Sequence, residues 1–332
     1  MRVTVVGAGV VGLTAALALS ERGATVEVLE RSSRLGEDAC SFCAGGMLAP
    51  WCEGESAEPE IVEWGRQAIG WWEKRVGGVR RNGALVVAAP RDKGEVDRFA
   101  ARTHNRRSVG ESEIAALEPD LAGRFRKGLY FDDEGHLDPR RALADLAQRL
   151  AERGVAIRFG VDGRDLRDEV DAILDCRGLA ARDALADLRG VRGEMLILRT
   201  KDIRLSRPVR FLHPRIPLYI VPRDDGEFMI GATSIESASR GPITARSAME
   251  LLNAAYALHP AFGEAEILEM RADARPAFPD NAPRLVTLGR RTYLNGFYRH
   301  GFLLAPAFAE RTAAAIFEKE TIDEDHRQRR RA

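Results

Sequence analysis

A glycine-rich segment near the start of the chain has the residue types and spacing of a dinucleotide-binding turn. Gly7, Gly9 and Gly12 lie between an apolar, β-branched run at residues 3–6 and a helical stretch. In such a turn the first glycine permits a tight bend and the second lets a pyrophosphate approach the backbone. The third permits close packing of helix on strand, and the helix N-terminus stabilises the anion. Glu30, which ends the next apolar run, is suited to accept hydrogen bonds from ribose hydroxyls. The segment therefore predicts a bound FAD or NAD.

The rest of the chain favours FAD. The GxGxxG pattern occurs once, whereas an enzyme that passes electrons between a flavin and a nicotinamide usually has two such folds. Residues 295–306 combine glycines, which let a flat ring approach the backbone, with the start of a helix, whose positive end would face the negative charge of a reduced flavin. We therefore expect one dinucleotide, FAD.

The hydrophobic pattern predicts the elements that must hold these residues. Residues 3–30 predict a βαβ unit, Asp138 before Pro139 is a helix-start signal, and the chain becomes β-rich from about Val191, with a hairpin through residues 224–226. The predicted helices are residues 13–22, 58–75, 93–102, 111–117, 139–154, 244–257 and 305–319. The predicted strands are residues 3–6, 25–29, 84–89, 155–159, 172–175, 195–198, 218–221, 228–230, 267–272 and 293–295, with a proline-rich loop at 276–283.

These elements predict a two-domain protein of the α/β (α+β) class. Residues 1–80, 138–190 and 275–320 form a discontinuous Rossmann-like FAD-binding domain in this interpretation, and residues 81–137 and 191–274 form a second, antiparallel-sheet domain for the substrate. Residues 321–332 are a charged tail that we expect to fray.

Charge and hydropathy exclude several classes of function. Fifty basic residues balance fifty acidic ones, so no overall field attracts nucleic acid or an anionic membrane. No apolar stretch approaches the ~18 residues of a membrane span. The first apolar run meets Gly7 after a few residues, which leaves no room for a signal peptide. We expect a soluble, cytoplasmic protein.

The cysteines do not predict a metal site. Cys40 and Cys43 form a CxxC pair near Cys52, but there is no second pair, and the first histidine is His104. Small buried thiols are the simpler interpretation, so we expect no metal.

Several short motifs together resemble one family of flavoproteins. Besides the glycine fingerprint they are residues 44–50 (AGGMLAP), residues 219–223 (YIVPR) leading to residues 231–233 (GAT), Arg275-Pro276, and residues 298–306 (YRHGFLLAP). The chain is similar over nearly its whole length to the D-amino-acid oxidase family of FAD-dependent oxidoreductases, and within it to the glycine oxidases of the ThiO type. Two departures are the run from Cys40 to Cys43, where relatives have Ser and Ala, and Ser234, where relatives often have Met.

The resemblance assigns roles to individual residues. It implies that Arg275 pairs with a substrate carboxylate, that Tyr219 donates to the same group, and that Arg299 lies at the flavin edge. An arginine fork can hold a carboxylate at two points. No base is required if the amine binds neutral and the hydrogen leaves as hydride, so that positioning carries the catalysis. The implied cofactor-binding residues are Gly7, Ala8, Gly9, Val10, Val11, Gly12, Glu30, Arg31, Gly46, Met47, Leu48, Gly178, His300, Gly301, Phe302 and Leu303.

The resemblance also implies an activity. Glycine, or a similarly small amino acid, is oxidised to the imine, which hydrolyses to glyoxylate and ammonia or passes to thiazole synthase for thiamine biosynthesis. O2 reoxidises the flavin and yields H2O2. The implied FAD is not covalently bound, because the chain has no Cys after Cys176 and no His before His104 to serve as a tether. A homo-oligomer is also implied. Two alternatives stay open: an amine or D-amino-acid dehydrogenase with an acceptor other than O2, and a flavin-bound protein without turnover.

Overall fold

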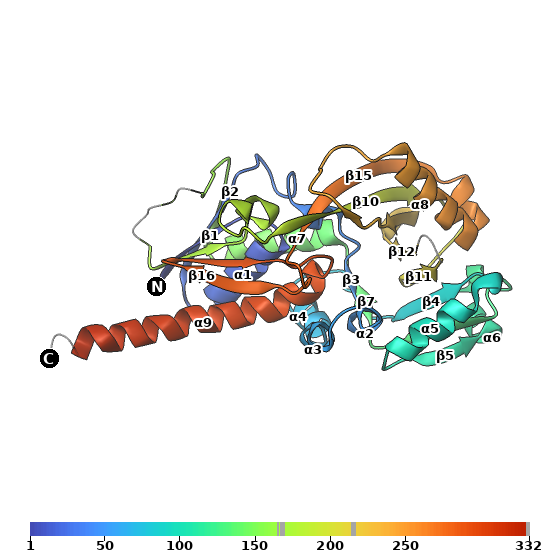
Figure 1. Cartoon of the computed structure of the whole chain (residues 1–332), viewed down its shortest axis with the longest axis horizontal. Coiled ribbons are helices and arrows are strands. Elements are labelled where there is room, and N and C mark those ends of the chain that lie inside the picture. The colour runs from blue at the N-terminus through green and yellow to red at the C-terminus, as the bar shows by residue number, and fades with distance from the viewer. Residues whose placement is uncertain (165, 167–169, 214–216, 330–332) are drawn as a thin grey trace. The chain divides into compact units, whose positions relative to one another are not determined.

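The computed structural model describes residues 1–164, 166, 170–213 and 217–329, and the chain divides into two compact units (Figure 1). Unit 1 is Met1–Phe42, Arg140–Arg189 and Pro276–Ala332, and unit 2 is Cys43–Pro139 and Gly190–Arg275. Residues 43–80 therefore group with the second unit, whereas the sequence pattern assigned them to the first. The reason is packing, because Ala49 and Cys52 lie in a core cluster with Val86, Ala88, Leu129 and Phe131.

Unit 1 is built on a six-stranded sheet. Its strand order is β16 (Arg284–Leu288), β17 (Arg291–Asn295), β9 (Ala172–Asp175), β1 (Arg2–Val6), β2 (Thr25–Glu30) and β8 (Ala156–Phe159). All neighbouring pairs are parallel except β16 with β17. Parallel strands need crossover connections, and the helices of unit 1 are α1 (Val10–Glu21), α7 (Pro139–Glu152) and α9 (Gly301–Arg329). Helices α1 and α9 lie side by side (Figure 1).

Unit 2 is built on a nine-stranded mixed sheet. Its strand order is β14 (Ile235–Glu236), β10 (Arg189–Arg199), β13 (Glu227–Gly231), β12 (Leu218–Pro222), β11 (Val209–Leu212), β4 (Ala84–Ala88), β6 (Lys127–Phe131) and β5 (Arg107–Gly110), with β15 (Glu266–Ala277) paired to β10. The other elements are β3 (Met47–Leu48), β7 (Gly135–His136), α2 (Pro50–Glu53), α3 (Pro59–Gly65), α4 (Ala68–Glu73), α5 (Gly94–Arg102), α6 (Glu111–Leu117) and α8 (Ala245–Leu258).

One face of this sheet packs against helix α8 and forms a buried hydrophobic core. Leu196, Ile220 and Ile230 pack in one buried cluster with Leu251 and Leu258 of α8. Because side chains alternate along a strand, the neighbouring residues of β10, β12 and β13 point to the opposite face. That second face is described with the site below.

Several predicted elements differ from the structure. The single helix predicted at residues 58–75 is two helices, α3 and α4. The loop predicted from residue 276 is wrong in its first part, because β15 continues through Pro276 to Ala277. Pro276 has no N–H to donate, but its carbonyl accepts a hydrogen bond from Tyr298 N–H at 2.8 Å, next to a bridge between Ala277 and Phe297. Helix α9 begins at Gly301, with Pro306 inside it, and continues to Arg329 through most of the tail that we expected to fray. Residues 330–332 of that tail lie outside the described residues.

Candidate functional site

Two glycines of the fingerprint are required by the fold of unit 1. Gly7 has φ +104°, and a Cβ there would lie 2.6 Å from the carbonyl oxygen of Cys176. A Cβ on Gly12 would lie 1.8 Å from the carbonyl oxygen of Gly7. A Cβ cannot be accommodated at either distance, so both positions require glycine. β1, α1 and the end of β9 therefore pack as closely as the glycine spacing predicted.

Gly9 is different, because the protein itself leaves room for a side chain there. Its backbone has φ −76° and ψ 179°, which any residue adopts, and a Cβ would meet nothing nearer than Ser41 Oγ at 3.5 Å. Gly9 is also the N-cap of α1 and supplies no side-chain cap to it. The Val10 N–H at the start of α1 donates to Ser41 Oγ at 3.3 Å. A glycine that the fold does not require, placed at a helix N-terminus, fits the close approach of a dinucleotide pyrophosphate.

The carboxylate of Glu30 is held beside this turn at the end of β2. It accepts hydrogen bonds from Ala8 N–H (2.8 Å), from Ser32 N–H (2.9 Å) and from Ser32 Oγ–H (2.8 Å). A carboxylate has about four acceptor positions, so one is left for a ribose hydroxyl. The adjacent Arg31 is exposed and pairs with Asp38 at 3.6 Å.

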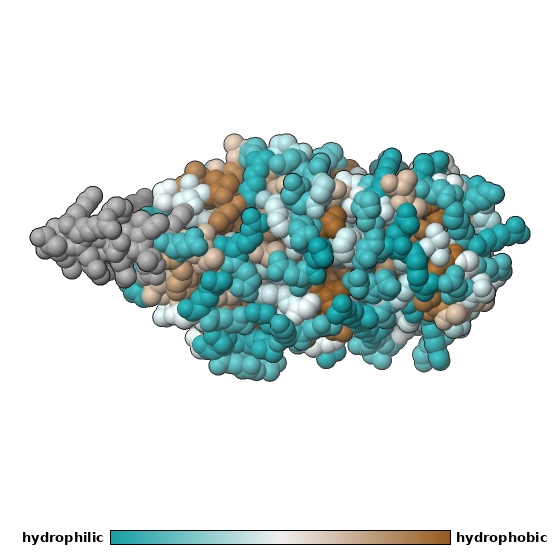
Figure 2. Space-filling model, turned by 90° about the horizontal axis from the view of Figure 1, so that it is seen from below, coloured by the Kyte–Doolittle hydropathy of each residue, from teal (hydrophilic) through white to brown (hydrophobic). Residues whose placement is uncertain are grey.

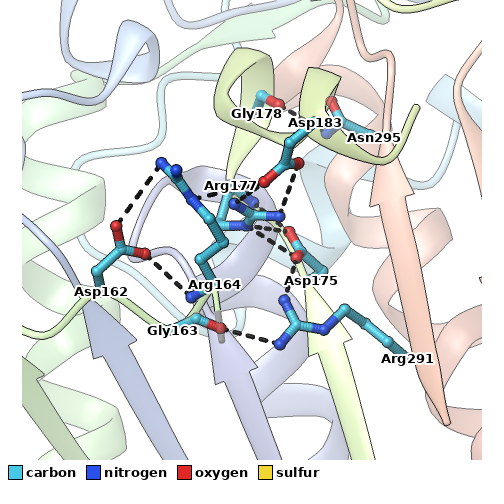
Figure 3. Close-up of polar contacts among 9 residues, drawn as sticks. All are labelled: Asp162, Gly163, Arg164, Asp175, Arg177, Gly178, Asp183, Arg291 and Asn295. Carbon is cyan, nitrogen blue, oxygen red and sulfur yellow. Dashed lines mark hydrogen bonds and ion pairs between the residues drawn. The ribbon is translucent and has the colours of Figure 1, made fainter. Parts of the chain in front are cut away.

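An ion-pair network lies at the end of β9, next to Gly7 of the fingerprint. The sequence analysis did not predict it. Figure 3 shows Arg177 between Asp175 and Asp183, with N–O distances of 2.8 and 2.9 Å. Arg291 of β17 also pairs with Asp175, at 2.9 Å. The Asn295 amide donates to the carbonyl of Gly178 (2.8 Å), which fixes the turn that follows. Alternating acidic and basic residues directly after a buried strand are the signal that could have indicated it.

The segment predicted to contact the flavin ring begins α9. A Cβ on Gly301 would lie 3.3 Å from Val10 Cγ1, so the first turns of α1 and α9 are in contact. Two helix N-termini therefore lie together in unit 1, and their positive ends favour negative charge nearby. His300, Phe302 and Leu303 are buried. Arg299, by contrast, is exposed and lies 5.8 Å from the ring centroid of Tyr298.

Tyr219 and Arg275 lie on one face of the unit 2 sheet, opposite α8. Tyr219 pairs with Gly231, which pairs with Met195 on its other side, and a Cβ on Gly231 would lie 3.0 Å from the tyrosine ring. A Cβ on Gly193 would lie 2.1 Å from Nη2 of Arg275. Gly193 and Met195 share a face because they are two residues apart in β10. The phenol and the guanidinium therefore share it too.

Arg275 differs from several other arginines of the chain in its partners. Within the residues that the structure describes, its guanidinium contacts one hydrogen-bond acceptor, the Thr233 carbonyl, at 3.2 Å, and forms no ion pair. Four other buried or nearly buried arginines each face a carboxylate: Arg177, Arg192, Arg207 and Arg210. A half-buried, uncompensated guanidinium beside a phenol is suited to an anionic ligand.

The Gly-Met segment packs against Tyr219 in the same unit. A Cβ on Gly45 would lie 2.9 Å from Tyr219 Cε2, and a Cβ on Gly46 (φ +75°) would lie 2.2 Å from the Leu137 carbonyl. Arg223 donates to the carbonyls of Gly45 (2.7 Å) and Leu137 (2.9 Å). Met47 and Leu48 form β3, which pairs with β7. The segment is thus clamped next to the candidate substrate face.

A buried acid lies beneath this segment. Glu134 is fully buried, and its Oε1 accepts a hydrogen bond from Cys52 N–H at 2.7 Å. Burial raises the pKa of the Glu134 carboxyl to about 8, against the opposing effect of the Cys52 hydrogen bonds. Nearby, Glu53 pairs with Arg210 at 2.7 Å. Glu134 is therefore protonated at neutral pH. The sequence analysis did not predict this buried acid, because Glu134 belongs to no motif.

Comparison with known proteins decides the family. A family model described as FAD dependent oxidoreductase (DAO) matches residues 2–315. A thiamine biosynthesis oxidoreductase named ThiO, from Rhizobium etli, is 56% identical over 96% of this chain and 98% of that protein. The chain belongs to the DAO family of FAD-dependent oxidoreductases. The predicted family, fold class and FAD dependence are thereby confirmed.

Other members of the DAO family are more distant. The glycine oxidase of Geobacillus kaustophilus is 27% identical over 96% of this chain and 93% of its own length. The crystal structure of a glycine oxidase from that organism superposes with a TM-score of 0.80 at 23% identity, covering 96% of this chain and 95% of the other. Among the residues that the structure describes, no helix is long and apolar enough for a bilayer crossing. The face seen in Figure 2 is mainly hydrophilic, with apolar residues in small groups.

Proposed function

We propose that this FAD-dependent oxidoreductase oxidises glycine, or a similarly small amino acid, to the imine with reduction of O2 to H2O2. The observation that carries the proposal is Arg275, a half-buried guanidinium that has no acidic partner in the described part of the chain and lies on the same sheet face as Tyr219. The likeness to a ThiO protein and to glycine oxidases supports the choice of reaction.

The residues of this chain bind and orient the substrate in the proposed reaction. The Arg275 fork holds the carboxylate at two points, the Tyr219 hydroxyl donates a third hydrogen bond, and Arg299 is assigned to the flavin edge. When bound, FAD would accept the hydride that leaves the Cα–H bond, while an N–H proton is released and the Cα–N bond becomes the C=N bond of the imine. Glycine and O2 thus become iminoacetate and H2O2, and water converts free imine to glyoxylate and ammonia. No side chain need act as a base if the amine binds neutral, so orientation carries the rate.

The cofactor assignment follows the two helix N-termini of unit 1. Gly9 and the first turn of α1 hold the pyrophosphate in this proposal, Glu30 accepts from the ribose, and the start of α9 faces the ring system. The residues from Gly46 to Leu48 and the Gly178 turn complete the contacts proposed.

Anaerobic reduction tests the proposal directly. Glycine added without oxygen should bleach the yellow flavin, and admission of air should restore the colour with one H2O2 formed per glycine oxidised. The Arg275→Ala variant should not bleach with glycine. Arg271→Ala is its matched control, because Arg271 lies on the same strand and pairs with Glu269. Absence of bleaching with glycine, sarcosine and D-alanine would refute the proposed reaction. Bleaching without peroxide would instead support a dehydrogenase.

We also propose that the imine supplies thiazole formation in thiamine biosynthesis, following the name of the Rhizobium etli relative. Growth of a ThiO-deficient strain without thiamine, restored by this chain and not by its Arg275→Ala variant, is the expected result. A cytoplasmic location and a homo-oligomeric state complete the proposal. Cell fractionation and light scattering measure them.

A further inference from the structure

We propose that Thr233 is a positioning residue: its hydroxyl, held by buried Glu194, fixes the peptide carbonyl that presets the Arg275 guanidinium for a carboxylate. The proposal rests on the role given to Arg275 above. All the residues involved belong to unit 2.

The Arg275 side chain is held at one point. Its Nη1 donates to the carbonyl of Thr233 at 3.2 Å, and its guanidinium lies against Gly193, where a Cβ would come within 2.1 Å of Nη2. Arginine has five donors, and this bond uses one of them. The position of Thr233 thus decides where those donors lie.

Thr233 is in turn fixed to Glu194 by three hydrogen bonds. Thr233 N–H donates to the Glu194 carbonyl (3.3 Å), and Glu194 N–H donates to Thr233 Oγ1 (2.9 Å). The Thr233 hydroxyl donates to Glu194 Oε2 (3.1 Å). The hydroxyl therefore accepts one bond and donates another, and the donated bond fixes the direction of its O–H.

Glu194 is a rigid anchor for this arrangement. It is fully buried, and its Oε1 accepts from Arg192 Nε (3.0 Å), Arg192 Nη2 (2.7 Å) and Thr244 N–H (3.4 Å). Burial acts to raise the pKa of Glu194, but hydrogen bonds from Ser247, Arg192 and Thr233 outweigh it and lower the pKa below its usual value. The carboxylate is thus ionised and joins β10, the end of β13 and the start of α8.

The consequence concerns binding rather than the chemical step. Arg275 is a long side chain, and ordering it when a ligand binds costs affinity. If the Thr233 carbonyl already holds the guanidinium in place, that cost is not incurred on binding. Loss of the Thr233 hydroxyl removes two of its three hydrogen bonds to Glu194 and leaves the backbone bond, so the peptide is held more loosely while the ligand itself is not touched. Affinity for a carboxylate should fall while kcat changes little.

Acetate binding tests the inference without turnover. The dissociation constant of acetate is measured on the FAD-loaded protein by flavin difference spectra and by protection against thermal unfolding. Thr233→Val should raise it about 3- to 10-fold, and Thr233→Ser should restore it to within twofold. Thr103→Val is the matched control, because Thr103 is a buried threonine of unit 2 whose hydroxyl donates to Phe99 O at 2.9 Å; it should leave acetate binding unchanged.

A double-mutant comparison separates this inference from the role of Arg275. In an Arg275→Ala background, Thr233→Val should have no further effect on acetate, because it acts through the missing guanidinium. An unchanged acetate affinity in Thr233→Val alone, or an effect of the same size in both backgrounds, would overturn the inference and leave the role of Arg275 intact. If Arg275→Ala alone leaves acetate binding unchanged, the proposed role of Arg275 fails as well.

Discussion

Replacement of Arg275 by alanine is the sharpest test of the proposed substrate site. In the free protein the guanidinium makes one hydrogen bond, to Thr233 O, and no ion pair within the described residues, so its removal leaves no buried charge without a partner. The fold should therefore survive, and the glycine fingerprint in unit 1 should keep its FAD. With substrate bound, the same change removes two charge-assisted hydrogen bonds, each worth about 1.5–3 kcal/mol. A loss of about 3 kcal/mol or more corresponds to a fall in kcat/KM of more than ~100-fold.

The assay is the initial rate of peroxide formation against glycine concentration, with flavin content measured on the same preparations. Arg275→Lys keeps the charge but not the fork, so it should recover only part of the activity. The reasoning is refuted if Arg275→Ala retains its FAD and oxidises glycine with kcat/KM within about threefold of the parent, a deficit of about 0.65 kcal/mol. Arg299 would then be the next candidate for the carboxylate.

Four further predictions follow from the sequence and the two units. Acid precipitation should release all flavin into the supernatant, and fluorescence left on the denatured polypeptide would contradict non-covalent binding. Glycine or sarcosine should have a higher kcat/KM than D-phenylalanine, although a methylene changes selectivity by only ~1–3 kcal/mol; peroxide rates decide, and a higher value for D-phenylalanine would contradict a small pocket. Gly9→Ala should fold with a near-parent Tm and bind FAD at least ~10-fold more weakly, whereas Gly12→Ala, whose Cβ would lie 1.8 Å from a carbonyl oxygen, should lose stability even without FAD. Glu134→Gln should remove a pH dependence of stability: Glu134 ionises near 4.5 when unfolded and near 8 when folded, so the free energy of unfolding of the parent falls across that window by up to a few kcal/mol. Urea denaturation at pH 5 and 8 measures it, and equal pH dependence of the two proteins would show that the buried carboxyl does not titrate as described.

Local patterns determined a large part of the fold. The βαβ unit is present as β1, α1 and β2, the Asp138-Pro139 signal marks the start of α7, and the hairpin through residues 224–226 joins β12 to β13. Each is set by residues within a few positions of one another, through strand alternation, helix capping or turn chemistry. The edge strand β16 and the extension of β15 through Pro276 were missed, because pairing with distant strands overrides a local proline or a weak apolar pattern.

By itself the sequence predicted a dinucleotide-binding turn at Gly7, Gly9 and Gly12, because the strand, the glycine spacing, the helix and Glu30 all lie within thirty residues of one another. It could not determine that Arg275 lies over Gly193 with no acidic partner among the residues described, or that Arg177 lies between Asp175 and Asp183. Whether a guanidinium is paired depends on which carboxylates the tertiary fold brings within about 4 Å, and those come from strands far apart in the chain. The tertiary structure therefore distinguishes Arg275, which we propose binds a carboxylate, from arginines such as Arg177 that are paired within the fold.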